Sequence, residues 1–330
     1  MNCFRLAATA AFRPVTAAAT AVTAVTALTM AGCAAQVARP AADPQQTSVV
    51  VAAVPAEGAA GLYIASEEGL FARAGLRVTI KTIEDPTEAI PLMRRGLVNV
   101  ASGEYTAYIA ADAAGIARMR IVAAEFALGP RVQEIMTAAR SPITSPAKLR
   151  GATIAVNAVG SETTDLLYTA LAPYGITPAQ VHVVAVPLPA MPAALAAHRV
   201  DAIYEFEPYV TEGGQLYGEQ DLIDLDSGAS AGFPVAGFGV LESWAAAHPR
   251  VVRAFAAVIA RGNAIAATNL AARQRALQTA LHLSPQVVAV MAAGTFPTAL
   301  DPVQVQRAAD LMLRYGQLRR PFAVASVTGP

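Results

Sequence analysis

Short apolar runs alternate with longer segments of helical character through the first two thirds of the chain. A first group of runs covers residues 48–54, 76–80 and 98–101, and a second group covers 152–156, 181–186 and 200–204. We interpret the segments between the runs as helices. Strands that alternate with helices predict an α/β fold, with parallel sheets covered by helices on both faces.

The two groups repeat one pattern. Gly75 and Gly175 each end the helix before the second strand of their group, and Val98 and Val200 each begin the third strand. Glycine suits the end of a helix because it adopts positive φ without a Cβ penalty. Two copies predict two α/β lobes, and facing lobes would form a ligand cleft at the carboxyl ends of their strands. One large doubly wound sheet is the alternative that the pattern leaves open.

The final third of the chain is predicted to be mainly helical. Residues 235–241 are typical of one more strand, and four helical segments follow at 249–268, 270–281, 285–293 and 302–315. Ser284-Pro285 and Asp301-Pro302 are helix starts, with an N-cap followed by proline at the first helical position. We expect this helical tail to pack on the first lobe. The predicted first lobe is then 48–140 plus 235–330, the second lobe is 141–234, and the chain crosses near 140 and 235.

Residues 1–47 predict export. Arg5 and Arg13 precede an uncharged run over 15–29, and Met30-Ala31-Gly32 stands directly before Cys33. The pattern is similar to the bacterial lipoprotein signal, in which the cysteine receives a diacylglycerol and becomes the new N-terminus. It implies a signal peptide over 1–32, a lipidated Cys33 and a flexible tether over 33–47. An ordinary secretory signal with an incidental cysteine is the alternative.

Charge and cysteine content exclude several classes. Lys and Arg number 24 against 24 Asp and Glu, with no basic stripe, so we expect no nucleic-acid partner. The only cysteines are Cys3 and Cys33, so we expect no disulfide after the signal. P-loop, H-E-x-x-H and paired C-x-x-C motifs are absent and the four histidines are scattered, so we expect neither metal nor cofactor.

Several consecutive motifs carry a family resemblance over about residues 48–325. They are residues 65–71 with 75–78, residues 141–143 with 148–156, Arg199-Val200-Asp201-Ala202 with Glu207-Pro208, and Tyr315-Gly316 with Pro321-Phe322. In this order they resemble the solute-binding proteins of ABC importers for nitrate, sulfonate and taurine, and for the pyrimidine precursor of thiamine. The resemblance implies a type II periplasmic-binding-protein fold, two lobes joined by two crossovers that close on a small molecule.

The resemblance also implies a role. A monomeric, non-enzymatic receptor would be anchored by lipid on the extracytoplasmic face of the cell membrane and would deliver its solute to the transmembrane subunits of an ABC permease. The alternative is an enzyme of the pyrimidine-precursor synthase type on the same fold. Those synthases use a histidine with a cysteine-rich iron-binding segment, and this chain has no such segment.

Loops at the strand ends supply the candidate site. We expect ligand contacts from Glu57, Ser102, Glu104, Tyr105, Asn157, Ser161, Glu162, Thr163, Tyr204, Glu205 and Glu207. Five of these residues are glutamates, and Arg131 is the one loop cation that the sequence places near them. Carboxylates repel an anion in a desolvated cleft and accept N–H donors readily. The sequence therefore favours a neutral or cationic nitrogen heterocycle, similar to the thiamine pyrimidine, over a sulfonate, taurine or nitrate.

Overall fold

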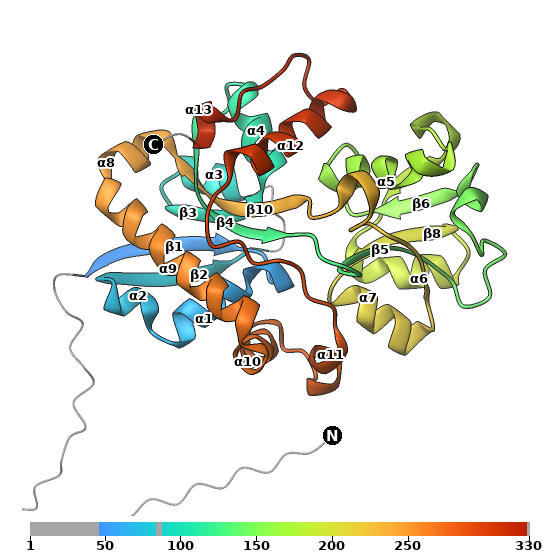
Figure 1. The fold of residues 1–330 in the computed structure, drawn as a ribbon, viewed down its shortest axis with the longest axis horizontal. Coiled ribbons are helices and arrows are strands. Elements are labelled where there is room, and N and C mark those ends of the chain that lie inside the picture. Colours follow the sequence, from blue (N-terminus) through green and yellow to red (C-terminus); the bar gives the residue numbers. More distant parts are fainter. Residues whose placement is uncertain (1–45, 84–87, 329–330) are drawn as a thin grey trace, which may run out of the picture. The chain divides into compact units, whose positions relative to one another are not determined.

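The structure, a computed structural model, describes residues 46–83 and 88–328, and the chain forms two five-stranded sheets with helices packed around each (Figure 1). The predicted signal peptide, Cys33 and the greater part of the predicted tether lie outside the described residues. We refer to the sheet that contains the first described strand, with its helices, as the first lobe, and to the other as the second lobe.

The first sheet has the strand order β2-β1-β3-β10-β4. Its strands are β1 (Thr47–Ala53), β2 (Leu76–Thr82), β3 (Val100–Glu104), β4 (Met119–Ala127) and β10 (Pro234–Leu241). β1 pairs in parallel with both β2 and β3, and its side chains are buried or half-buried from Val49 to Ala53, as expected for a strand covered on both faces. β10 lies antiparallel between β3 and β4.

The second sheet has the order β7-β6-β8-β5-β9, which repeats the first. Its strands are β5 (Gln133–Thr137), β6 (Thr153–Val156), β7 (His182–Ala185), β8 (Ala202–Phe206) and β9 (Gln220–Asp224). β6 pairs in parallel with β7 and β8, and β5 lies antiparallel between β8 and β9. The predicted duplication is confirmed, and the single large sheet is excluded. The sheets are mixed rather than parallel, because β5 and β10 each follow a crossing and run back along their new sheet.

The chain crosses between the lobes at a different place from the one predicted. Because β5 belongs to the second sheet, the first crossing lies between Ala127 and Gln133 rather than near residue 140. The return lies between β9 and β10, near the expected residue 235. The Leu128 amide donates to the Phe233 carbonyl at 2.9 Å, so the two crossing segments are hydrogen-bonded to each other. This pair is the connection about which the lobes would hinge.

The helices of the first lobe come from both ends of the described chain. They are α1 (Ala60–Glu67), α2 (Leu70–Arg73), α3 (Ala89–Arg94), α4 (Tyr105–Ala113), α8 (Glu242–Ala247), α9 (Pro249–Thr268), α10 (Leu270–Leu281), α11 (Pro285–Val290), α12 (Pro302–Arg314) and α13 (Ala325–Thr328). The four predicted tail helices are confirmed, although α11 ends earlier than expected. The Ser284 and Asp301 side chains accept from the Val287 and Val303 amides, which confirms both N-caps.

The second lobe carries shorter helices, α5 (Glu162–Leu171), α6 (Met191–Ala196) and α7 (Tyr209–Glu212). Among the described helices, α9 alone is long and apolar enough to cross a membrane by length and composition. It packs on α1 and β4 of the first lobe and buries Phe255, Ile259 and Asn263 there. We therefore assign α9 to the core of that lobe.

Candidate functional site

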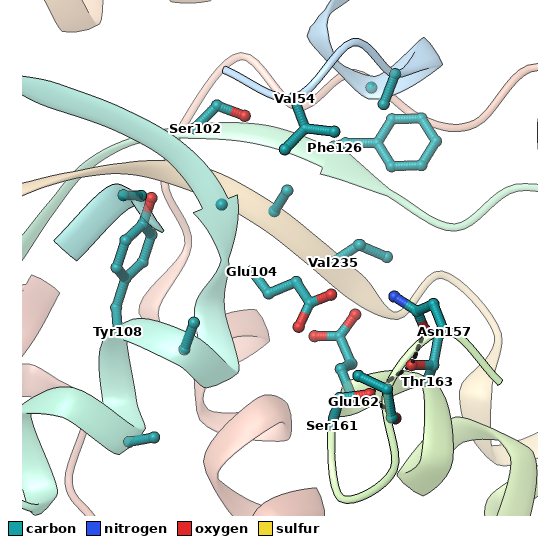
Figure 2. A pocket seen from close by; sticks show the side chains of 18 of the residues that line it. Val54, Ser102, Glu104, Tyr108, Phe126, Asn157, Ser161, Glu162, Thr163 and Val235 are labelled. Atoms are coloured by element: carbon teal, nitrogen blue, oxygen red, sulfur yellow. Dashed lines mark hydrogen bonds between the residues drawn. The ribbon is translucent and has the colours of Figure 1, made fainter. Parts of the chain in front are cut away.

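A cleft of ≈ 1970 Å³ is lined by residues of both lobes (Figure 2). All but two of the predicted site residues line it, namely Glu57, Ser102, Glu104, Asn157, Ser161, Glu162, Thr163, Tyr204 and Glu207. They lie on or after β1, β3, β6 and β8, which are neighbouring parallel strands in the two sheets. The cleft therefore opens where an open α/β sheet ordinarily binds its ligand.

Two predicted residues lie outside the lining. Tyr105 begins α4 and is 2 % exposed, and its ring lies so close to β10 that a Cβ on Gly237 would approach it to 2.5 Å. Glu205 lies between Tyr204 and Phe206 on β8, and both of these neighbours line the cleft. Because successive strand side chains alternate between faces, Glu205 points to the opposite face, where it meets Glu219.

The polar lining residues missed from the sequence include Glu125, Gln133 and Gln317. Glu125 is a lone carboxylate within the apolar strand β4, and that isolation is the signal that could have marked it. Gln133 begins β5 and accepts a hydrogen bond from the Tyr204 hydroxyl. Gln317 follows α12, far along the chain from every other lining carboxamide or carboxylate, and no local pattern distinguishes it.

Ser102 and Glu125 form a buried pair on β3 and β4. The Ser102 hydroxyl lies 2.8 Å from both carboxylate oxygens of Glu125, whose side chain is almost fully buried. Burial raises the pKa of Glu125 to about 8, although the Ser102 hydrogen bond lowers it in part. Asn263 of α9 donates from Nδ2 to the Glu125 carbonyl at 3.2 Å and so fixes the strand behind the carboxylate.

Glu104 and Glu162 come from opposite lobes, and Figure 2 shows their carboxylates facing each other. Glu104 ends β3 and is half-buried, whereas Glu162 begins α5 and is 2 % exposed. Burial, then the charge of Glu104 and that of Asp165, raise the pKa of Glu162 well above its usual range. Burial also raises the pKa of Glu104, and the Thr106 hydroxyl, 3.3 Å from its Oε2, lowers it in part.

The loop before α5 is held by its own hydroxyls. The Thr163 hydroxyl donates to Asn157 Oδ1 at 2.6 Å (Figure 2). The Ser161 hydroxyl donates to the Ala158 carbonyl at 2.7 Å. Ser161 occupies the N-cap position, yet its side chain makes no capping hydrogen bond. These bonds present Asn157, Ser161 and Thr163 together on the second-lobe wall of the cleft.

Glu57 and Glu207 lie at another part of the cleft. Glu57, in the 3₁₀ turn Glu57–Ala59, is 2 % exposed. Burial raises its pKa to about 8, the charge of Arg273 and the nearby Gly294 amide lower it, and the charge of Glu207 raises it. Glu207 accepts from the Ala292 amide at 2.8 Å and from the Thr211 hydroxyl at 2.9 Å, so its carboxylate joins α7 to the segment after α11.

The cleft is acidic inside. Among the residues that the structure describes, the charged side chains buried in its lining are all carboxylates, namely Glu57, Glu125, Glu162 and Glu207. The lining arginines, Arg118, Arg319 and Arg320, are all exposed. Arg131, the cation expected near the cleft, is exposed and pairs with Asp221 at 2.7 Å. Phe126, Tyr204, Phe206 and Tyr209 add aromatic surface on which a flat ring can stack.

A family model described as NMT1/THI5 like matches residues 57–270, which include both sheets except for β1. The chain belongs to the NMT1/THI5-like family. The resemblance drawn from the sequence motifs is thereby confirmed. A comparison with curated proteins gives no significant match.

Solved structures with this fold include the periplasmic aliphatic sulphonate binding protein SsuA of Escherichia coli, with a TM-score of 0.71, 18% identity and coverage of 85% of this chain and 97% of that one. The periplasmic nitrate-binding protein NrtA of Synechocystis PCC 6803 has a TM-score of 0.69, 15% identity and 83% coverage of each chain. The desulfurization enzyme DSZB has a TM-score of 0.64, 18% identity and coverage of 86% and 97%. The predicted periplasmic-binding-protein fold of this NMT1/THI5-like chain is confirmed.

Proposed function

We propose that this NMT1/THI5-like protein is the extracytoplasmic solute-binding component of an ABC importer. Its cleft would capture a small organic solute between the two lobes and deliver it to the permease. Family membership supports this role, as does a fold shared with the sulphonate-binding SsuA and the nitrate-binding NrtA. The fold alone does not separate a receptor from an enzyme, because DSZB shares it. The export signal predicted from the sequence favours the receptor.

The solute that we propose is a neutral or cationic nitrogen compound, with a flat heterocycle similar to the thiamine pyrimidine as the favoured class. The acidic interior of the cleft carries this proposal. A sulfonate placed there would face several carboxyl groups away from water, and each one that ionises as the pH passes its raised pKa opposes the anion, at a cost on the order of several kcal/mol as for like charges at an interface. Aminoheterocycle N–H groups would instead donate charge-assisted hydrogen bonds, and the lining aromatic rings would stack on the ring.

Lipid attachment at Cys33 is part of the same proposal. A diacylglycerol on the new N-terminus would hold the receptor near its permease at the outer face of the membrane. The native protein should then partition into the detergent phase, and Cys33→Ser should release it or leave the precursor uncleaved. A mature protein that starts elsewhere and carries no lipid would contradict the anchor without touching the binding function.

Ligand-induced closure tests the receptor role. A ligand that contacts both lobes favours the closed state and raises the melting temperature by mass action. We therefore expect a stabilising solute to reduce the radius of gyration in small-angle X-ray scattering. It should also slow amide hydrogen exchange at residues 128–132 and 231–233. A saturating solute that changes neither quantity would contradict closure around the ligand.

A further inference from the structure

Glu104 and Glu162 form an acidic pair that spans the two lobes, as Glu57 and Glu207 also do. Glu104 belongs to the first lobe and Glu162 to the second, and their carboxylates face each other (Figure 2). The pair therefore depends on the separation of the lobes. If the lobes hinge at the crossing segments, the two carboxylates approach when the cleft closes and separate when it opens.

Glu125 and Glu207 have partners within the protein, because Glu125 accepts from Ser102 and Glu207 accepts from Ala292 and Thr211. Both carboxylate oxygens of Glu57 are buried without a hydrogen-bond partner, but the positive charge of Arg273 acts on that group. Glu162 Oε2 is buried and has no hydrogen-bond partner among the described residues. An unpaired buried carboxylate oxygen is costly, so its position in the cleft points to a partner that arrives with the ligand.

The groups packed around the pair supply no balancing charge. Asp165, on the same helix as Glu162, adds negative charge, and the hydroxyls of Tyr105 and Tyr204 experience the field of Glu162. Thr106 donates its hydroxyl to Glu104, and the same hydroxyl partly lowers the pKa of Glu162. The electrostatic influences resolved on Glu104 and Glu162 include no arginine, lysine or histidine of the described chain. Two carboxylates in this setting repel each other when both are ionised.

We propose that Glu104 and Glu162 form a single cation-binding subsite across the two lobes, which takes one ammonium, amidinium or protonated aminoheterocycle group of the ligand. This subsite proposal rests on the proposed function and names the residues that bind the charged group of the ligand. One cationic group with several N–H donors can donate to a carboxylate on each side. It neutralises the repulsion that opposes closure, so occupancy of the subsite and closure of the lobes are coupled.

The subsite also exchanges a proton. In the empty cleft one carboxyl group of the pair holds a proton, because two facing carboxylates do not both ionise readily. A bound cation replaces that proton, which passes to solvent. Binding of a cation should therefore release a proton and strengthen as the pH rises. Calorimetry in two buffers of different ionisation enthalpy measures this release directly.

The test uses benzamidine, 4-aminopyridine and butylamine as cationic probes, with benzamide and benzoate as the neutral and anionic counterparts of benzamidine. Binding to the full mature chain at pH 8 is compared for wild type, Glu104→Gln, Glu162→Gln and the control Glu67→Gln, which alters an exposed residue at the end of α1. We expect a cationic probe to bind wild type and the control alike. Each cleft variant should lose about tenfold or more in affinity, the usual effect of removing a charged hydrogen-bond partner. The number of protons released on binding should be smaller in both cleft variants than in wild type.

The possible outcomes distinguish failure of the subsite proposal from failure of the proposed receptor function. If both cleft variants still bind the cation, the cation-binding subsite lies elsewhere and the receptor role is unaffected. Binding of benzoate but of no cation would overturn the subsite and the proposed ligand class together. Failure of every cation to bind wild type would overturn the subsite, while closure on another solute would still support the receptor. Folding of the variants is checked by their melting temperature without ligand at pH 8, which should be no lower than that of wild type because each removes a buried charge.

Discussion

Gln317 Nε2 donates to Asp165 Oδ2 at 2.6 Å, which joins the segment after α12 of the first lobe to α5 of the second. The same nitrogen lies 3.3 Å from the Ser161 carbonyl, at the start of α5. Nearby, the Tyr315 and Tyr168 rings lie 5.5 Å apart between centroids. The lobes thus touch away from the crossing segments, at the helix that carries Glu162. If the cleft opens by separation of the lobes, this contact breaks.

Removal of the Gln317 side chain should loosen the closed state. Gln317→Ala deletes one hydrogen bond to a carboxylate, so we expect the affinity for a bound solute to fall by about 3- to 10-fold. Amide exchange at the N-terminal turn of α5 should become faster. Gln286→Ala changes an exposed glutamine on α11 and serves as the control. Equal affinity and equal exchange in Gln317→Ala and wild type would show that the contact has no influence on closure.

The two-lobed architecture could be predicted from the sequence because the signal was repeated. Each lobe places three parallel strands in the same order, and the apolar runs at 48–54 and 152–156 open the two copies. The tail helices were predicted because Ser284-Pro285 and Asp301-Pro302 mark their starts chemically. The first crossing was misplaced because β5 is short and mixes polar with apolar residues, and nothing local shows which sheet receives it. Sheet membership is a tertiary property.

The site residues that could be predicted are those in loops at the ends of strands. Glu57, Glu104 and Glu162 were identified because they follow or end apolar runs, where an α/β sheet places its ligand. Glu205 lies outside the cleft because the face of β8 that meets the ligand is set by packing, not by composition. Glu125 was missed because it lies inside a strand that otherwise resembles buried core.

Stability should decrease as the pH rises from about 5 to about 8. Burial raises the pKa of Glu57 and Glu125 from 4.5 to about 8, so the folded state holds protons that the unfolded state has released over this interval. The stabilisation is complete below the unfolded pKa and is lost as the pH passes the folded value, by on the order of a few kcal/mol for each group. Urea unfolding across this range measures the slope.

Glu125→Gln isolates one contribution to that slope. The amide has no titratable proton and its Oε1 can still accept from Ser102, so we expect a flatter pH profile with stability retained at pH 8. Buried Glu134, whose pKa is also raised to about 8, contributes with the same sign and should leave a residual slope. A slope unchanged in Glu125→Gln would show that this carboxylate is already ionised in the folded protein at low pH.

The crossing of α1 and α9 should not tolerate a methyl group. A Cβ added at Gly262 would lie 2.1 Å from the Gly61 carbonyl oxygen, which is backbone and cannot rotate away. Gly262→Ala must separate the helices, and we expect a cost of about 1–3 kcal/mol in the free energy of unfolding. Gly214→Ala is the control, since its Cβ would meet nothing nearer than the Glu219 carbonyl at 3.9 Å. Equal melting of Gly262→Ala and wild type would contradict the close contact.

The charge of the ligand tests the central claim most directly. Isothermal titration calorimetry at pH 8 compares benzamidine and 4-aminopyrimidine with taurine and ethanesulfonate. The proteins are wild type, the two single cleft variants Glu104→Gln and Glu162→Gln, and Glu205→Gln, which changes a matched glutamate outside the cleft. We predict binding of a nitrogen compound that the cleft variants weaken and Glu205→Gln preserves, with no binding of either sulfonate. Micromolar binding of taurine or ethanesulfonate, unaffected by the cleft substitutions, would contradict the account.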